Sequence, residues 1–472
     1  MLSGILGGTV GSFLELEGQV FRMAAEAASD VLAGLLEDAD ERIFRERDAE
    51  RYRVIDTRTR ELDTMFGTTL GFSRRYYRDL ETGELVFLLD EALKLPGRVR
   101  QSPGLREMSV HLAMTNSYRK TRDSLEQVLG ARVTSHETIR QCVLKAGDKR
   151  EESLRYEPEV EPLQAMANGH KFIFVELDGI NCHIQRNRRA RRRGIEVRLM
   201  YLHEGWKECP NNKERFKPSK LRIRGWYPDD DCFDELAAYL CERYGVDENT
   251  VVVIGGDRAG WIRGARARFG DATVLYQIDR FHIDRDITRI FRKHSESRRR
   301  LIDALDSDPT GASFMAALAE ELVNLPYKAK EEGRRMLNDL LQIPECVCDY
   351  RVRLRDMGVD PEGLRPLGAV ESRNGLFTAR LKGFKKAWSP RGLMAMVNTL
   401  AAKFEGGLDS LLRDLFDSLA PLPGEEMLKE KAVESVWDQI DARGPARSGN
   451  IPVKGAGIVR TGGMSSLFAS IA

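Results

Sequence analysis

Two aspartates follow two apolar runs, and this placement is typical of a carboxylate site built on a sheet. The run FIFV over residues 172–175 leads to Asp178, and the run VVVI over residues 251–254 leads through two glycines to Asp257. Unbroken apolar runs of this kind are typical of strands covered on both faces. Carboxylates at the ends of neighbouring strands offer the oxygen ligands that Mg²⁺ and Mn²⁺ prefer. Two ordinary strand-to-loop aspartates are the alternative, and a third ligand is needed to decide.

The surrounding sequence predicts the elements that would position these aspartates in an α/β region. Alternating apolar residues over 195–201 predict a strand, and the run over 273–278 predicts a buried strand that ends at Asp279. Residues 231–244 fit a helix between strands. Residues 181–185 are expected to form a separate strand that pairs with the first run in a hairpin.

A third carboxylate lies much further along the chain. Glu371 follows Gly-Ala-Val at an expected helix start, and the basic residues Arg373 and Lys382 come after it. The intervening residues 283–341 are expected to be helical, rich in arginine at first and in leucine, alanine and glutamate later. The order is therefore strand–Asp, strand–Asp, a helical stretch, and then Glu on a helix.

The N-terminal region combines a helix with a small sheet. Apolar residues recur at helical spacing from Phe13 to Met23, which predicts a helix over residues 12–48. Residues 61–78 are rich in β-type side chains, and a turn at 81–84 precedes an expected strand over 85–89. This pattern indicates a small β-meander.

Residues 105–150 resemble a helix-turn-helix. Gly130 ends an expected second helix, and Thr134 with Glu137 forms a capping box that opens a third. Apolar residues at 139 and 143 would face the preceding helix, which leaves basic and amide side chains available to DNA. An ordinary three-helix connector is the alternative. The candidate DNA-binding residues of this third helix are Arg140, Gln141 and Lys145.

The loop over residues 186–193 is a second candidate DNA contact. Arginines at this density repel one another unless an anion lies between them, and phosphate matches the guanidinium group with two hydrogen bonds. A solvated loop is the alternative. The arginines are Arg186, Arg188, Arg189, Arg191, Arg192 and Arg193.

Composition sets limits on the class of protein. The chain has 472 residues with a net charge of only +1, so affinity for nucleic acid must come from local clusters of charge. No apolar run is long enough to span a membrane, and the N-terminus lacks the basic segment of a signal peptide. Seven scattered cysteines predict a reducing, cytoplasmic compartment. Cys346 and Cys348 are expected to be buried thiols, with a zinc site as the alternative.

At this point the chain resembles bacterial insertion-sequence DDE transposases, in particular a family with a Mutator-like arrangement, in which a helical insertion precedes the glutamate. The resemblance covers most of residues 10–405. The motifs that carry it are Leu177-Asp178-Gly179, Gly256-Asp257-Arg258-Ala259-Gly260-Trp261-Ile262, Asp279-Arg280-Phe281-His282 and Glu371-Ser372-Arg373-Asn374.

The resemblance implies a catalytic centre and its cofactor. Asp178, Asp257 and Glu371 would form the catalytic triad and hold two Mg²⁺ or Mn²⁺ ions, with Asp279 and His282 in a supporting role. Such a centre hydrolyses a phosphodiester at the element end, after which the freed 3′-OH attacks target DNA.

One residue departs from the family's pattern. Arg258 stands where glycine is expected after the aspartate, and it would place a long cation beside the metal centre. That cation could hold a phosphate, or it could mark a copy that has lost its activity.

The resemblance also implies partners and location. The partners would be the element's terminal inverted repeats and target DNA, with Arg373 and Lys382 among the contacts. The protein would act as a homo-oligomer on DNA, without a membrane, and would be associated with the nucleoid. A DNA-binding protein of transposase descent that no longer cuts, or a structure-selective nuclease on the same sheet, are the competing hypotheses.

The expected fold is α/β, with an RNase H-like catalytic domain interrupted by a helical insertion and preceded by an α+β region that contains the helix-turn-helix-like segment. The expected regions are an N-terminal helical region (1–50), a small β-meander (51–95), a helix-turn-helix-like DNA-binding region (96–150), the RNase H-like domain (168–294 and 365–405), the helical insertion (295–364), and a C-terminal helix with a flexible tail (406–472).

Overall fold

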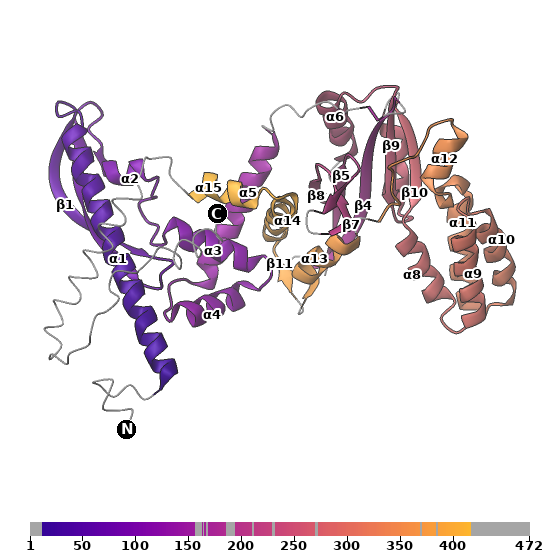
Figure 1. The fold of residues 1–472 in the computed structure, drawn as a ribbon, viewed down its shortest axis with the longest axis horizontal. Coiled ribbons are helices and arrows are strands. Elements are labelled where there is room, and N and C mark those ends of the chain that lie inside the picture. Colours follow the sequence, from indigo (N-terminus) through magenta and orange to yellow (C-terminus); the bar gives the residue numbers. More distant parts are fainter. Residues whose placement is uncertain are drawn as a thin grey trace, which may run out of the picture. The chain divides into compact units, whose positions relative to one another are not determined.

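The structure is a computed structural model in which the chain divides between Arg100 and Gln101 into two compact units. Each unit is described by itself (Figure 1). None of the helices in the described part of the chain is long and apolar enough to cross a membrane. The described residues are 12–155, 163, 165–166, 169–185, 194–209, 212–228, 232–269, 272–368, 371–383 and 386–416. The predicted arginine loop and flexible tail lie outside them.

The first unit packs a long helix against a three-stranded antiparallel sheet. Carboxylates of the helix accept hydrogen bonds from backbone N–H groups of the middle strand. The Ser73 N–H donates to Glu37 at 2.8 Å, and the Arg75 N–H donates to Asp40 at 3.2 Å. The core contains leucines from helix and sheet together with Phe72. The elements are α1 (Phe13–Glu46), β1 (Tyr52–Asp63), β2 (Thr69–Asp79), β3 (Leu85–Val86) and α2 (Leu88–Ala92).

The expected strand over residues 85–89 is wrong beyond β3. The chain turns into α2 instead, because Asp90 in its first turn is held by two buried arginines. Arg60 Nη1 lies 2.7 Å and Arg74 Nε lies 2.9 Å from the Asp90 carboxylate. These ion pairs hold the first turn of a helix against the sheet, a long-range contact that a local strand pattern does not contain.

The second unit contains a mixed six-stranded sheet with the order β10-β9-β4-β5-β8, and β11 pairs with the end of β4. Strands β10, β9, β4 and β11 are parallel to one another, whereas β5 runs antiparallel to β4 and to β8. The protein is therefore of the mixed α/β class. The strands are β4 (Lys171–Ile184), β5 (Gly194–His203), β8 (Arg222–Trp226), β9 (Thr250–Gly256), β10 (Thr273–Ile278) and β11 (Ala387–Trp388), with a separate hairpin of β6 (Trp206–Cys209) and β7 (Asn212–Pro218).

Both faces of this sheet are covered, as the unbroken apolar runs predict. On one face, Ile173 and Val175 belong to a core with leucines of α6 (Cys232–Tyr244). On the other, Tyr201 bonds to α13 (Glu371–Lys382), and Gly225 lies under α14 (Pro390–Glu405), where an added Cβ would come within 2.5 Å of Val397.

A group of helices follows β10 and lies beside that strand in Figure 1. These helices share the core of the sheet through Ile283, Leu318 and Leu340. Cys346 and Cys348 are buried there as thiols. The helices are α8 (Arg280–Ile290), α9 (Ser295–Ser307), α10 (Ala312–Glu321), α11 (Tyr327–Leu341) and α12 (Tyr350–Asp356).

The helix-turn-helix-like segment belongs to the same compact unit as the sheet. Its third helix, α5, packs directly on α14, because Gly147 leaves so little room that an added Cβ would lie 2.5 Å from the carbonyl oxygen of Ala395. Arg150 pairs with Glu405 at 2.5 Å on the same contact. The helices are α3 (Pro103–Ala113), α4 (Tyr118–Leu129), α5 (His136–Arg155) and α15 (Leu408–Phe416).

Two local predictions are corrected by the structure. The strand does not stop at Asp178, since β4 runs on to Ile184 and residues 181–184 continue its ladder with β5 rather than forming a new hairpin. The predicted capping box is also wrong. Ser135 Oγ accepts from the Thr138 N–H at 3.0 Å, whereas the Thr134 hydroxyl is buried against Gln101.

Candidate active site

The two sequence-predicted aspartates lie at the same level of neighbouring parallel strands. The ladder between β4 and β9 ends at the pair Leu177 and Gly256, so Asp178 and Asp257 are the next residue on each strand. Gly256 is required here, because an added Cβ would lie 2.8 Å from the Leu177 carbonyl oxygen and 2.9 Å from Ile262. The apolar runs therefore hold two carboxylates side by side where the strands separate.

Asp178 is held by two donors and is hard to ionise. Its Oδ1 accepts from the Gly179 N–H at 2.7 Å, and its Oδ2 accepts from the side-chain amide of Asn374. Burial raises the pKa of Asp178 to about 6, and the negative charge of Asp257 adds to the increase. A cation at this position would relieve both effects.

Asp257 is half-buried in the turn after β9. Its Oδ1 accepts from the Ala259 N–H at 2.8 Å, and its carbonyl oxygen accepts from the Tyr276 hydroxyl at 2.7 Å. These bonds fix the turn, so the position of this carboxylate is set by β9 and β10 together.

Helix α13 begins at Glu371 and lies on the Asp178 face of the sheet. Asn374 is buried, donates to Asp178 and accepts from the Tyr201 hydroxyl of β5. Positions 371 and 374 are three residues apart, so they lie on one face of the helix. The side chains of residues 371–373, which include the predicted Arg373, are outside the described part of the structure.

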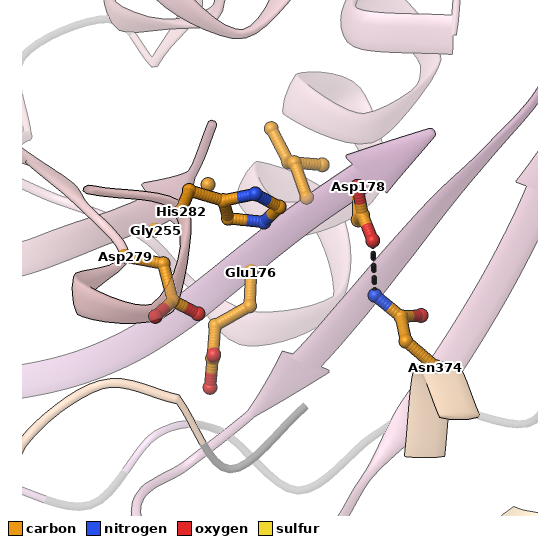
Figure 2. Close-up of a pocket in the computed structure, with 8 residues that line it drawn as sticks. Glu176, Asp178, Gly255, Asp279, His282 and Asn374 are labelled. Atoms are coloured by element: carbon orange, nitrogen blue, oxygen red, sulfur yellow. Dashed lines mark hydrogen bonds between the residues drawn. The ribbon is translucent and has the colours of Figure 1, made fainter. Parts of the chain in front are cut away.

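A small open depression lies between these elements. Figure 2 shows the carboxyl groups of Glu176 and Asp279 and the imidazole of His282 on one side, with Asp178 and Asn374 on the other. The lining residues are Glu176, Leu177, Asp178, Gly255, Gly256, Asp279, His282 and Asn374. The sequence-predicted supporting residues therefore line the same depression as Asp178, whereas Asp257 lies beside it.

Asp279 and His282 are positioned by the start of α8. Asp279 is the N-cap residue, and its Oδ1 accepts from the Phe281 N–H at 2.9 Å. Burial raises the pKa of Asp279, and the nearby charge of Glu176 contributes. Burial also lowers the pKa of His282, with a further contribution from Arg285. Both groups are therefore shifted toward their neutral forms.

Glu176 was not predicted from the sequence, although the signal is present. It stands two residues before Asp178, so the alternation of a strand puts both on one face. Its buried carboxylate lies 3.2 Å from His203 Nε2 and accepts from the Gly368 N–H at 3.1 Å. Because apolar residues surround Glu176 in the sequence, it does not stand out as a carboxylate at the end of a strand.

Arg258 has two ion-pair partners that the sequence did not predict. Its guanidinium group pairs with Asp286 of α8 at 2.6 Å and with Asp339 of α11 at 2.7 Å. Two helical carboxylates engage it, so it ties the turn after Asp257 to α8 and α11.

The predicted recognition helix presents its polar residues differently from the expectation. Glu137 bonds to Arg140 Nη2 at 2.7 Å and to Gln141 Nε2 at 2.8 Å. The bond from Arg140 lowers the pKa of Glu137 to about 2, with Gln141 contributing. Lys145 is exposed. Base contacts by Arg140 and Gln141 would therefore require these bonds to open.

Three donor atoms at metal-ligand spacing occur in one place among the described side chains. Only Glu107, His111 and Asp409 bring three donor atoms within 4.8 Å of one another, and they lie partly exposed on α3 and α15. The described carboxylates of the depression are therefore neighbours, but no three of them bring one oxygen atom each within 4.8 Å of one another. Their chemistry still fits Mg²⁺ or Mn²⁺, which prefer oxygen ligands.

The fold and the site define a mixed α/β protein with a carboxylate-lined depression where the ladder between two parallel strands, β4 and β9, ends. The chain belongs to the UPF0236 family, whose model, described as an uncharacterised protein family, matches residues 9–413.

Relatives and a solved structure show similarity over most of the chain. A UPF0236 protein in the vanSb 3′ region of Streptococcus gallolyticus is 25% identical over 414 residues, which is 85% of each chain. A UPF0236 protein of Caldanaerobacter subterraneus subsp. tengcongensis is 23% identical over 405 residues, which is 83% of this chain and 78% of the relative. The Drosophila P element transposase strand transfer complex covers 71% of this chain and 86% of that chain at 11% identity. Its TM-score of 0.23 is too low to carry an argument.

Proposed function

We propose that this protein is a DDE-type DNA transposase of an insertion sequence, with an RNase H-like catalytic domain. One observation carries the proposal: Asp178 of β4 and Asp257 after β9 come directly after the last pair of the parallel β4–β9 ladder, and the helix that begins at Glu371 is bonded to Asp178 through Asn374. This is the arrangement that the resemblance to DDE transposases requires.

The proposed chemistry assigns roles to the residues of the depression. Asp178, Asp257 and Glu371 would hold two Mg²⁺ or Mn²⁺ ions. Such ions, when bound, stabilise the attacking and leaving oxygens of a displacement at phosphorus. Asn374 orients the Asp178 carboxylate through its bond to Oδ2. Asp279 and His282 support the site from the start of α8, and no protein nucleophile is needed.

A face of α8 is the proposed path of the DNA strand into the site. Phe281 is 48% exposed, the exposed Arg285 follows it at helical spacing, and the exposed Arg292 and Lys293 lie in the turn after α8. Arg285 is close enough to the depression that its charge partly offsets the burial effect on the pKa of Asp178. Exposed cations with an aromatic ring are suited to phosphates and a stacked base.

Three further groups are proposed DNA contacts. Lys382 is exposed at the end of α13, and its positive charge, like that of Arg285, lowers the pKa of Asp178. The arginines of residues 186–193 and Arg373 remain proposed phosphate contacts. The exposed side of α5 is proposed to contact the terminal repeats, and the protein is proposed to act as a homo-oligomer on DNA near the nucleoid.

The names of the relatives support a mobile element. The name of the Caldanaerobacter relative joins eleven locus labels. A protein that is encoded at many loci is what repeated insertion of one element would produce.

The test is cleavage by the full-length chain of DNA that carries the repeats flanking its coding region. Asp178→Asn, Asp257→Asn and Glu371→Gln should each reduce Mg²⁺-dependent cleavage more than about 100-fold while DNA affinity stays within about twofold. Asp247→Asn is the matched control, because Asp247 lies before β9 at the opposite end of the strand and pairs with Lys171. Binding without cleavage in the unmodified chain would favour a DNA-binding protein, and nicking without strand transfer would favour a nuclease.

A further inference from the structure

Glu176 is a buried carboxylate that the proposed chemistry does not use. It lies on β4, opposite Gly255 of β9 and Tyr201 of β5, and is 3% exposed. A buried carboxylate is costly unless hydrogen bonds hold it in place. Both of its oxygens have such partners, and the two partners come from distant parts of the chain.

The first partner is His203 on β5, which holds one oxygen of the Glu176 carboxylate. His203 is fully buried, and its Nε2 lies 3.2 Å from Glu176 Oε1. Its ring stacks on Phe174 with centroids 5.0 Å apart and meets Trp206 edge-on at 5.1 Å. The imidazole therefore cannot turn without disturbing the aromatic packing, and Glu176 is held in one orientation.

The second partner is the backbone of the segment that leads into α13. The Gly368 N–H donates to Glu176 Oε2 at 3.1 Å. Gly368 has φ of 113°, and a Cβ there would lie 3.8 Å from Asp279 Oδ1, so the segment passes close to the supporting aspartate. Gly368 stands three residues before Glu371.

Neighbouring contacts hold the same segment on the sheet. Leu367 covers Gly255, where an added Cβ would lie 3.2 Å from Leu367 Cδ1 and 3.3 Å from Glu176 Cγ. The Arg365 carbonyl accepts from the Tyr350 hydroxyl at 2.5 Å. Segment 365–368 is therefore fastened at three points, and Glu176 holds its last described residue, Gly368.

We propose that Glu176 is a positioning residue, which clasps Gly368 and thereby keeps the start of α13 beside Asp178. The positioning role rests on the proposed transposase function, whereas the clasp itself does not. Asn374 holds the first full turn of the helix from inside, and Glu176 holds the chain just ahead of it. Together they limit how far the Glu371 position can move from Asp178.

Hydrogen exchange of the full-length chain tests the clasp directly. Glu176→Ala should speed exchange about tenfold in peptides that cover residues 364–375, because the Gly368 N–H loses its acceptor. Glu176→Gln keeps one acceptor oxygen and should stay near the unmodified rate. The matched control is Glu405→Gln, another buried glutamate, which accepts from the Ile223 N–H at 2.5 Å far from this segment. Unchanged exchange in Glu176→Ala would overturn the clasp.

The positioning role is tested by the Mg²⁺ concentration that gives half-maximal cleavage. Glu176→Ala should raise it about tenfold without changing DNA affinity, and Glu176→Gln should restore it. Faster exchange with an unchanged Mg²⁺ requirement would overturn the positioning role. If the unmodified chain cleaves no DNA, the proposed function fails, and exchange alone decides the clasp.

A second variant guards against misfolding of Glu176→Ala. Gly368→Ala keeps Glu176 but places a side chain at φ of 113°, a region that only glycine adopts freely. It should loosen the same segment and raise the same Mg²⁺ requirement. If neither variant altered exchange over residues 364–375 while both folded, the proposal would be wrong.

Discussion

At the scale of single residues, the site is governed by carboxylates that are buried near one another. Asp178 is the clearest case, since burial and the charge of Asp257 raise its pKa to about 6. Its ordinary value is 3.8, so the protonated form is favoured in the folded state relative to the unfolded chain. This raised pKa links the stability of the metal-free protein to pH.

The first prediction concerns that linkage in EDTA. A raised carboxyl pKa contributes stability that is present below about pH 4 and is lost as the pH rises through about 6. The Asp178→Asn side chain cannot ionise. The free energy of unfolding of this variant, minus that of the unmodified chain, should therefore increase between pH 4 and pH 7, by at most about 3 kcal/mol. Urea denaturation at both pH values measures it. A difference that does not change with pH would contradict the raised pKa.

The second prediction concerns Asn374. Asn374→Ala removes the donor to Asp178 and the acceptor for the Tyr201 hydroxyl. Cleavage should fall about 10- to 100-fold with little loss of DNA affinity, as expected when the partner of a metal ligand is removed. Asn398→Ala, a change of a buried asparagine in α14, is the control. Equal losses in the two variants would indicate a packing effect only.

At the scale of elements, local sequence patterns predict most strands and helices but not their long-range partners. The apolar runs correctly indicate β9 and β10 as buried strands, and Gly130 ends α4 with φ of 71°. Asp178 was expected at a strand end, yet β4 continues because β5 pairs with it to His183. Glu176 and the ion pairs of Arg258 were not predicted, because their partners lie on distant elements, which spacing along one segment cannot reveal.

The third prediction concerns the crossing of α5 and α14. Gly147→Ala should cost roughly 1–3 kcal/mol of stability, because the added Cβ meets the backbone of Ala395. Gly264→Ala is the control, since it lies at the end of α7 (Gly260–Gly264) with no heavy atom within 4 Å of an added Cβ. Thermal unfolding of both variants measures the difference. A Gly147→Ala chain as stable as its control would show that the two helices can separate freely.

The fourth prediction concerns the exposed face of α8. Arg285→Gln and Arg292→Gln should weaken binding to every DNA sequence alike and lower the slope of binding against salt by about one each. Phe281→Ala should instead weaken binding to DNA with unpaired ends. Arg300→Gln is the control, because Arg300 already pairs with Glu320 and Glu321. Loss of affinity for one sequence only would contradict phosphate contact.

At the scale of the whole molecule, the division between Arg100 and Gln101 separates two cores. The apolar residues of the first unit gather around Phe72, whereas α3, α4 and α5 share the second unit with the sheet. The helix-turn-helix-like segment therefore shares its compact unit with the sheet. Its packing on α14 is contributed by residues some 250 positions away, as in the pair of Arg150 and Glu405. No local pattern contains that information.

The fifth prediction follows from this division. A fragment of residues 101–418 should fold cooperatively by itself, whereas a fragment of residues 151–418 should not, because it leaves the apolar side of α14 uncovered. Circular dichroism and urea titration of both fragments measure this. A stable, cooperative fragment that ends at Arg150 would contradict the shared core.

The segment that contains the helical insertion is bonded to strands of the site at both of its ends. At its beginning, the Asp279 N–H donates to the Gly256 carbonyl, and at its end the Gly368 N–H donates to Glu176. Each junction is thus anchored to a sheet strand rather than to the other junction. Members of one family could lengthen, shorten or exchange the intervening helices as a cassette, and so acquire new partners, while the geometry between Asp178 and α13 was inherited unaltered.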